Sequence, residues 1–240
     1  MTARTNAVGA GRPGAASSER SLTTLADVSR REQILSVAAE LFAERGFHGV
    51  SVAELGTACG ISGPALYRHF ASKDAMLAEM LVSISEELLG VGRRRVAEAV
   101  GPREALHALV DWHVDFALHN KALIVVQDRD WASLPSEARE QVRALQRRYV
   151  ELWVAQLRGV HAELSPKRAR AMAHAAFGLI NSTPHSAMLS EPEMASVLEQ
   201  MALRALDVPG GGAASPWDVA QPAHPTAGSP RDVLLQRGML

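Results

Sequence analysis

Residues 51–73, SVAELGTACGISGPALYRHFASK, constrain the fold more than any other stretch of this chain. Ser51 and Glu54 have the S-x-x-E spacing of a capping box, which predicts that a short helix starts here. Gly60 predicts a tight turn, and Ser62 is typical of the residue that caps a second helix. That second helix is expected to run to the end of the letters LYRHF. The stretch therefore predicts two short helices joined by a glycine-containing turn.

Two short helices in this arrangement are what a reader of duplex DNA needs, because the second helix has to enter the major groove. Upstream, Ile34, Ala38, Leu41 and Phe42 recur at helical spacing, and Gly46 is positioned to end that helix. Together the three helices predict a helix-turn-helix head. The alternative is an ordinary helical bundle whose polar residues only decorate its surface. The caps, the turn and the basic and aromatic residues of LYRHF all lie at the spacing that a helix-turn-helix requires, which favours the head.

From about Arg30 to Leu81, the letters resemble the N-terminal DNA-binding domain of the TetR/AcrR repressors. The resemblance implies an all-α protein of about nine helices. Three of them would form the helix-turn-helix DNA-binding domain, and the rest a C-terminal helical bundle that binds a ligand and forms a homodimer. Capping and periodicity along the chain independently predict a similar number of helices.

The resemblance also implies DNA contacts for particular residues. Ser51, Tyr67, His69 and Lys73 are expected to bind phosphates, which fixes the register on the duplex without reading its sequence. Arg68 is expected to read a base, because a guanidinium group can bind guanine through two hydrogen bonds in the major groove.

Two further contacts and two departures complete the expected DNA-binding set. Ser62 belongs to the set as the cap of the second helix, and Ala65 is placed to touch a thymine methyl group. Many relatives have a polar or basic residue where this chain has Gly63, and often glycine where it has Pro64. Because Gly63 has no side chain, sequence specificity is expected to shift toward Arg68 and Ala65.

Charge does not mark a polybasic DNA-binding segment. The net charge is −1, and residues 29–74 hold as many basic as acidic side chains. DNA binding is therefore expected to depend on where a few cations lie. Arg4, Arg12 and Arg20 in the N-terminal extension are either a flexible electrostatic arm or part of a solvated leader, and both interpretations stay open.

Composition also bears on the compartment. The chain has no apolar run long enough to span a bilayer, and its first 27 residues contain no secretory signal. Cys59 is the lone cysteine, so an internal disulfide is excluded and a cytoplasmic location is expected. A small buried thiol is favoured over a redox sensor at Cys59, because nothing nearby in sequence would lower its pKa.

Catalytic motifs are missing from the sequence. The nine histidines show no metal-ligand spacing, and there is no cysteine pair, phosphate-binding glycine loop or nucleophile elbow. We therefore expect a protein that is not an enzyme, with no catalytic residue, metal or cofactor.

Composition shifts divide the chain into four parts. Residues 1–28 are expected to be a disordered extension, and 29–74 to be the DNA-binding domain. Residues 75–208 are expected to be the helical effector-binding and dimerisation domain, and 209–240 a disordered tail. Within the third part, breakers and periodicity predict helices over 103–119, 123–127, 136–159, from 165 toward 184, and from 191 to about 206.

The last two long helices are expected to form the dimer interface. Ala169, Ala173 and Ala176 would give the first a smooth face that allows close approach. The apolar stripe of the second comprises Val197, Leu198, Met201 and Leu206. A helix-turn-helix normally reads paired half-sites, so a homodimer on a palindromic operator is expected. The alternative is that both faces pack only against their own core.

A ligand pocket is expected between the helices of the bundle. Its candidate residues combine apolar bulk with few hydrogen-bonding groups, which suits a mostly apolar small-molecule effector. The alternative, which is favoured for each residue taken singly, is an ordinary core position. The candidates are Trp112, His113, Phe116, Gln127, Trp131, Tyr149, Trp153, Phe177 and Asn181.

The Ala-rich helices and the letters ALIVVQDRDWASLP resemble actinobacterial regulators of acyl-CoA and lipid catabolism. That resemblance implies an acyl-CoA or fatty-acid-like effector, with an aromatic or drug-like molecule as the rival. The expected function is a repressor that its effector releases from DNA, with the helix from Ser72 acting as the lever. The alternative is a helical adaptor whose head binds protein instead of DNA.

Overall fold

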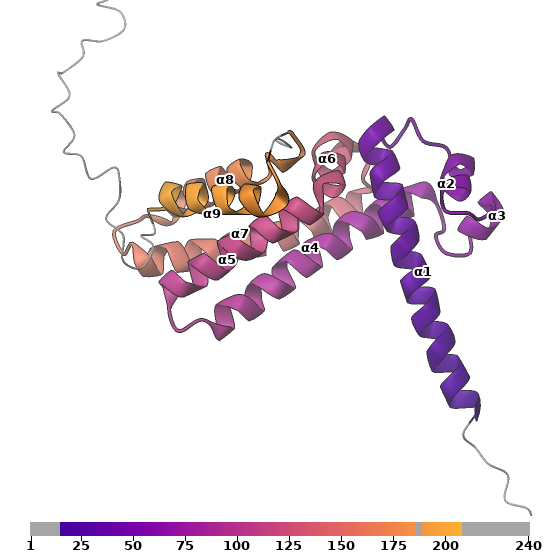
Figure 1. Ribbon diagram of the computed structural model, residues 1–240, viewed down its shortest axis with the longest axis horizontal. Coiled ribbons are helices and arrows are strands. Elements are labelled where there is room, and N and C mark those ends of the chain that lie inside the picture. Colours follow the sequence, from indigo (N-terminus) through magenta and orange to yellow (C-terminus); the bar gives the residue numbers. More distant parts are fainter. Residues whose placement is uncertain (1–14, 186–188, 208–240) are drawn as a thin grey trace, which may run out of the picture. The chain divides into compact units, whose positions relative to one another are not determined.

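A computed structural model describes residues 15–185 and 189–207 of the chain, with side chains from residue 30 onward. Within these residues the chain forms nine α-helices, two short 3-10 turns and no strand, which confirms the all-α expectation (Figure 1). None of these helices is both long enough and apolar enough to cross a membrane.

The head is built from three helices whose ends follow the expected residues. They are α1 (Ala15–Arg45), α2 (Val52–Ala58) and α3 (Gly63–Leu66). Ser51 and Glu54 form the expected capping box, and Ser62 caps α3 by accepting a hydrogen bond from the N–H of Ala65. Gly46 and Gly60 both have positive φ angles, as a helix end and a tight turn require.

Helix α1 begins earlier than the sequence predicts. Residues 15–28 were expected to be disordered, but they form the first half of this helix. The reason is that no glycine or proline interrupts the chain between Ala15 and Arg45, so nothing stops the helix from extending toward the N-terminus. Arg4, Arg12 and the expected tail 209–240 lie outside the described residues.

Helix α3 is shorter than predicted. It ends at Leu66, and residues 67–69 form a turn instead of continuing the helix to Phe70. In that turn the N–H of Arg68 bonds to the carbonyl of Ala65 at 3.2 Å, and the N–H of His69 to that of Leu66 at 2.9 Å. These i→i−3 bonds tighten the chain, so Tyr67 and Arg68 project from a turn.

The remaining six helices form the body, and Ser72 caps the first of them by accepting from the N–H of Ala75. They are α4 (Lys73–Glu98), α5 (Pro102–His119), α6 (Lys121–Asp130), α7 (Ser136–Val160), α8 (Pro166–Ile180) and α9 (Glu191–Ala205). The 3-10 turns are Trp131–Ser133 after α6 and Thr183–His185 after α8.

Two apolar clusters hold these helices together. One lies in the body, around the fully buried Trp153 and Leu157 of α7. The other unites the head with the start of α4, and it also includes Val126 of α6 and Val142 of α7. The small head therefore shares its core with the body, as expected for a three-helix unit that buries little surface by itself.

Gly92 allows two body helices to approach closely. Helix α4 runs without a break through Gly90 and Gly92. A Cβ atom at Gly92 would lie 2.8 Å from Cε2 of Tyr149 on α7. This glycine is therefore needed for packing against α7.

The alanine face of α8 points inward, which corrects the expected dimer face. Ala169, Ala173 and Ala176 are buried in the protomer's own core, because their spacing of four and three residues aligns them on the side that faces the rest of the body. The exposed small residues of α8 are Ala171, Ala175 and Gly178.

Helix α9 divides its apolar stripe between two faces. Leu198 and Leu206 are buried in the protomer's core. Val197 and Met201 are 39% and 48% exposed. Half of the predicted stripe is therefore structural, and the other half lies on the surface.

Candidate nucleic-acid interface and ligand cavity

The turn after α3 carries two exposed side chains of the predicted DNA-contacting set. Tyr67 is 54% exposed, and Arg68 is also exposed. The side chain of Arg68 makes no hydrogen bond or ion pair with the described residues, so its guanidinium group is available to a ligand. Ser62 is exposed, while Ala65 and His69 are half-buried.

Ser51 is exposed, but its hydroxyl group is already engaged. It donates to Oε2 of Glu54 at 2.6 Å and accepts from the N–H of Glu54 at 3.2 Å. The hydrogen bonds from the side chain and the N–H of Ser51 lower the pKa of Glu54, so this carboxylate stays charged. A phosphate at Ser51 would therefore approach a negative charge, which disfavours the contact unless the cap rearranges.

Lys73 points into the head and does not extend from its surface. Its Nζ donates to the carbonyls of Phe47 at 2.7 Å and Val50 at 2.8 Å, and lies 4.3 Å from the centroid of the Phe47 ring. Two of the three N–H groups of the ammonium thus hold the connection between α1 and α2. A contact between Lys73 and DNA stays a prediction, and its structural role was not evident from sequence.

Two arginines of α1 also stabilise the head from within. Arg30 donates to the carbonyl of Cys59 at 2.6 Å. Arg31 pairs with Glu79 of α4, donates to the carbonyl of His69 and stacks on the ring of Phe70 at 4.2 Å. Arg31 thereby fixes the turn that carries Tyr67 and Arg68, a role that its helical position alone did not reveal.

Cys59 is buried in the head, as expected from its position. Burial raises the pKa of its thiol, with the nearby Arg30 acting in the opposite direction. The thiol is therefore protonated at neutral pH and is a packing group.

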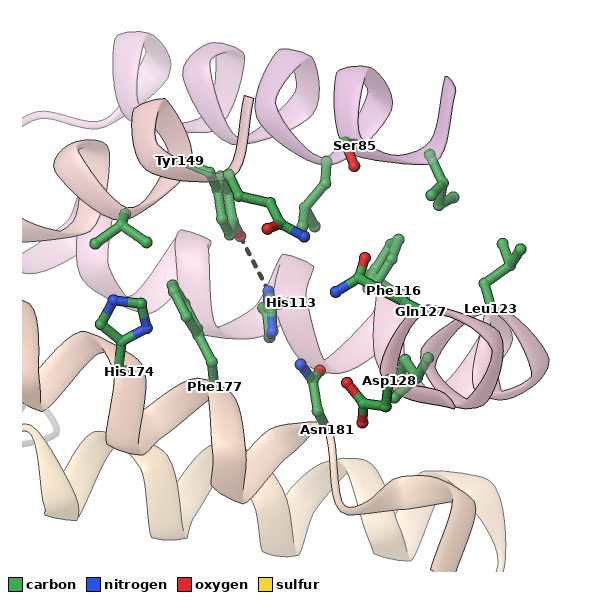
Figure 2. Close-up of a pocket in the computed structure, with 15 residues that line it drawn as sticks. Ser85, His113, Phe116, Leu123, Gln127, Asp128, Tyr149, His174, Phe177 and Asn181 are labelled. Carbon is green, nitrogen blue, oxygen red and sulfur yellow. Dashed lines mark hydrogen bonds between the residues drawn. The ribbon is translucent and has the colours of Figure 1, made fainter. Parts of the chain in front are cut away.

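A cavity of about 230 Å³ lies in the body, with residues of α4, α5, α6, α7 and α8 in its lining (Figure 2). Six of the nine residues predicted for a ligand pocket line it. They are His113, Phe116, Gln127, Tyr149, Phe177 and Asn181. The sequence reasoning thus identified polar and aromatic groups that the fold brings together from four helices.

The three tryptophans among the nine candidates do not line the cavity. Trp112 is half-buried and donates from Nε1 to the carbonyl of Leu88 at 3.2 Å. Trp131 packs against the core of the head and carries Arg143 over its ring at 5.5 Å. Trp153 is fully buried and meets the ring of Phe177 edge-on at 4.9 Å, so it supports the cavity from behind.

The residues that sequence reasoning missed come mainly from α4 and α6. The apolar members are Ile84, Leu88, Leu123 and Ile124, with Val150 of α7. The polar members are Ser85, Asp128, Gln146 and His174. Helical periodicity marks such positions as inward-facing, but it does not distinguish a packed core from a cavity wall.

Stacked rings build one wall of the cavity. The imidazole of His113 stacks on Phe177 at 4.8 Å and on Tyr149 at 5.7 Å between centroids. Nδ1 of His113 lies 3.3 Å from the hydroxyl of Tyr149, the contact drawn in Figure 2. These contacts fix the orientation of the imidazole ring.

Burial keeps both polar members of this wall uncharged. It lowers the pKa of His113 to about 4, with Asn181 acting weakly in the opposite direction. Burial also raises the pKa of the Tyr149 hydroxyl above its ordinary value. At neutral pH the wall therefore presents a neutral imidazole and a protonated phenol.

Two polar atoms at the cavity lack partners. Nε2 of His113 and Oδ1 of Asn181 are both buried, and neither has a partner at full hydrogen-bonding geometry, although the Asn181 side chain lies near enough to the imidazole to act on the pKa of His113. The lining contains no lysine or arginine, and its acidic residue is Asp128. This arrangement suits a neutral guest more than an anion.

The C-terminal end of α6 connects the cavity with the head. Leu123, Gln127 and Asp128 line the cavity, and the next residue, Arg129, donates to the carbonyls of Phe42 and Ala43 at the end of α1. Asp130 then accepts from the N–H of Phe47. A displacement of α6 would therefore act on the end of α1 and on the connection to α2.

A second hollow of about 530 Å³ lies between α1, α4 and the junction of α5 with α6. Its rim carries Glu32, Glu40 and Glu87 on exposed positions. Ile84 and Leu123 line both hollows, so they form the wall between them. Unpartnered buried polar atoms occur at the first cavity, which is the better ligand candidate.

Two family models match the chain. The model for bacterial regulatory proteins of the tetR family matches residues 34–80, and the model for the tetracyclin repressor-like C-terminal domain matches residues 99–206. The matched segments correspond to the head and to most of the body.

Individual proteins extend this likeness. The HTH-type transcriptional repressor KstR2 of Rhodococcus jostii is 35% identical over 130 residues, which cover 53% of this chain and 63% of that repressor. The solved TetR family transcriptional regulator PfmR from Thermus thermophilus is 31% identical with a TM-score of 0.61, and the match covers 71% of this chain and 97% of PfmR.

A more distant structure shows the fold alone. It is the transcriptional regulator FadR from Bacillus subtilis, solved in complex with stearoyl-CoA. FadR is 16% identical with a TM-score of 0.58, and the match covers 72% of this chain and 98% of FadR.

Proposed function

Because this chain belongs to the TetR family of bacterial regulatory proteins, we propose that it is a ligand-responsive transcriptional repressor acting in the cytoplasm. It binds a palindromic operator as a homodimer and leaves the operator when an effector binds. The family is one of transcription regulators and not of enzymes. The observation that carries the proposal is the direct connection, through α6, between the cavity and the head.

The DNA interface centres on the turn after α3. Arg68 reads a base in the major groove, because its guanidinium group is exposed and unpaired. Tyr67 and His69 bind phosphates beside it, and Ala65 touches a thymine methyl group. Ser51, Ser62 and Lys73 act mainly as caps and clamps that hold this surface in shape.

The dimer forms through the outward faces of α8 and α9. Val197 and Met201 are large apolar side chains left exposed on α9. On α8 the exposed small residues Ala171, Ala175 and Gly178 allow another helix to approach closely. Two helices from each protomer would then pack as a four-helix interface with two-fold symmetry.

The effector occupies the cavity beside His113. Residues 75–208 then act as the effector-binding and dimerisation domain, and residues 29–74 as the DNA-binding head. The apolar lining suits an acyl chain, and the stearoyl-CoA complex of FadR supports an acyl thioester as one candidate. An aromatic or drug-like molecule is the rival, because stacked rings form one wall.

Release from DNA follows from a shift between two head positions. An effector changes the affinity for DNA only if it binds more tightly to the protein with its heads in one of these positions than in the other. Helix α4 is the lever expected from the sequence. Helix α6 is a second lever, because Arg129 contacts the end of α1 and Asp130 contacts the connection between α1 and α2. We expect the effector to weaken operator binding while the dimer stays intact.

The test is fluorescence anisotropy of the purified protein on the duplex upstream of its own gene, with random DNA as the control. Selective binding that weakens as salt rises supports the repressor. The adaptor alternative predicts no salt-dependent affinity for any duplex. The proposal is contradicted if the protein binds random DNA as tightly as it binds the upstream duplex and other genomic operator fragments.

A further inference from the structure

We infer that the cavity binds an uncharged, mostly apolar molecule with one hydroxyl group, which His113 and Asn181 hold by a pair of hydrogen bonds. This inference rests on the proposed function, because it takes the cavity as the effector site. It goes further by stating the chemical class of the group that the cavity recognises.

The first step is the pair of unpartnered polar atoms. His113 is only 3% exposed, and its Nε2 has no hydrogen-bond partner. Oδ1 of Asn181 is buried and unpartnered as well. Figure 2 shows the two side chains next to each other at the cavity, with Asn181 pointing toward the imidazole ring. Buried polar atoms are almost always paired, so two unpaired ones at a cavity indicate a missing partner.

The second step assigns donor and acceptor. His113 is neutral at pH 7, so it carries a proton on one nitrogen. The protonated Tyr149 hydroxyl lies 3.3 Å from Nδ1, and we assign it as the donor in this contact. The proton of the imidazole is then on Nε2, which makes Nε2 a donor. Oδ1 of Asn181 is an acceptor.

The third step matches a ligand group to this pair. A hydroxyl group accepts one hydrogen bond and donates another, so it satisfies Nε2 of His113 and Oδ1 of Asn181 at once. An ether oxygen or a carbonyl oxygen accepts from Nε2 and leaves Oδ1 unpaired. A carboxylate has no proton for Oδ1 and meets no lysine or arginine in the lining, while the carboxylate of Asp128 repels it.

The fourth step concerns size. The cavity of about 230 Å³ is smaller than most ligand pockets. It therefore holds a small molecule, or the apolar arm of a larger one, and not a nucleotide group. The rings of Phe116 and Phe177 and the side chain of Leu123 are positioned to contact the apolar part.

The experiment compares four probes with an octyl or octanoyl chain by isothermal titration calorimetry on the full chain without DNA. They are 1-octanol, octyl methyl ether, octanoate and octylamine, which differ in the polar end. We expect 1-octanol to bind roughly 5- to 100-fold tighter than the ether, because the ether leaves one buried acceptor unpaired. Octanoate and octylamine are expected to bind at least as weakly as the ether.

Variants separate the hydrogen bonds from the shape of the cavity. Asn181→Leu removes the acceptor that only the alcohol can pair with, so it should bring the ratio of octanol to ether affinity close to one. His113→Phe removes the donor that both probes use, so it should weaken both and keep the preference for the alcohol. His107→Phe is the matched control, because His107 lies on the same helix as His113 but does not line the cavity. Its ratio should equal that of the wild type. Thermal melting checks that each variant folds, and Asn181→Leu and His113→Phe test the pair from opposite sides.

The inference is overturned if the ether, octanoate or octylamine binds as tightly as 1-octanol, or if no probe binds. It is also overturned if Asn181→Leu keeps the preference for the alcohol, or if His113→Phe leaves the affinities of both probes unchanged. These outcomes leave the DNA-binding assay untouched, so a selective DNA binder without the preference contradicts the ligand class alone. Failure to bind any duplex contradicts the repressor.

Discussion

Asp130 of α6 accepts a 3.2 Å hydrogen bond through Oδ1 from the backbone N–H of Phe47, which lies 83 residues earlier in the chain. Its other oxygen, Oδ2, lies 3.3 Å from Arg129, whose guanidinium group also holds the carbonyls at the end of α1. A buried carboxylate on the helix that borders the cavity thus fixes the connection that leads into the head.

Asp130→Ala is expected to lower the free energy of unfolding by about 1–3 kcal/mol, because the N–H of Phe47 loses its acceptor in a buried place. It should also weaken the response of DNA affinity to an effector. Urea unfolding and anisotropy with and without 1-octanol measure the two effects. Asp128→Asn, on an exposed residue of the same helix, is the control for stability. Equal stability losses in both variants would contradict a specific role for Asp130.

Lys73→Met and Arg68→Ala should differ in their effects. Lys73→Met removes a charged donor from the carbonyls of Phe47 and Val50, so it should lower the free energy of unfolding by about 1–3 kcal/mol and weaken binding to all duplexes. Arg68→Ala should change stability by less than about 0.5 kcal/mol, because the side chain is exposed and unpaired.

On DNA, Arg68→Ala should bring the affinities for the preferred and the random duplex closer together. Melting curves and anisotropy on the two duplexes measure these quantities. Unchanged stability in Lys73→Met would show that the hydrogen bonds of Lys73 to Phe47 and Val50 do not stabilise the head. If Arg68→Ala still prefers the same duplex over random DNA as strongly as the wild type, Arg68 does not read a base.

Local sequence signals predicted the helix ends of the head well, because each cap or turn depends on residues only a few positions apart. The capping box of Ser51 and Glu54, the turn at Gly60 and the caps of Ser62 and Ser72 all depend on neighbours in sequence. The start of α1 was predicted wrongly, because a helix that lacks a breaker has no sequence signal for where it begins.

Tertiary contacts explain what sequence reasoning missed at the sites. Lys73 was read as a surface cation, but its partners at Phe47 and Val50 come from a connection more than twenty residues away. The inward direction of Ala173 and the outward direction of Met201 depend on which neighbouring helix each face meets. Periodicity identifies a face but does not reveal its partner.

Met201→Glu is expected to disrupt the proposed dimer, because it places a charge in an apolar interface. Size-exclusion chromatography with light scattering should detect a shift from dimer toward monomer, together with weaker operator binding. The helix should persist, since Met201 is 48% exposed in the protomer. Ala155→Glu, on an exposed position of α7, is the control. A dimer that survives Met201→Glu and Val197→Glu together would contradict this interface.

Stability is expected to fall in mild acid because of His113. Burial lowers its pKa to about 4 in the folded protein, whereas the unfolded chain has the ordinary value near 6.5. The unfolded state therefore binds more protons between these values, so the stability that His113 contributes is present above about pH 6.5 and is lost as the pH falls toward 4.

The loss amounts to about 3 kcal/mol by the conversion of pKa shift to free energy. Urea unfolding at pH 7.5, 5.5 and 4.5 measures it in the wild type and in His113→Phe. The variant should lose less stability than the wild type across this window, because phenylalanine does not titrate. Identical losses in the two proteins would mean that other groups govern the acid sensitivity.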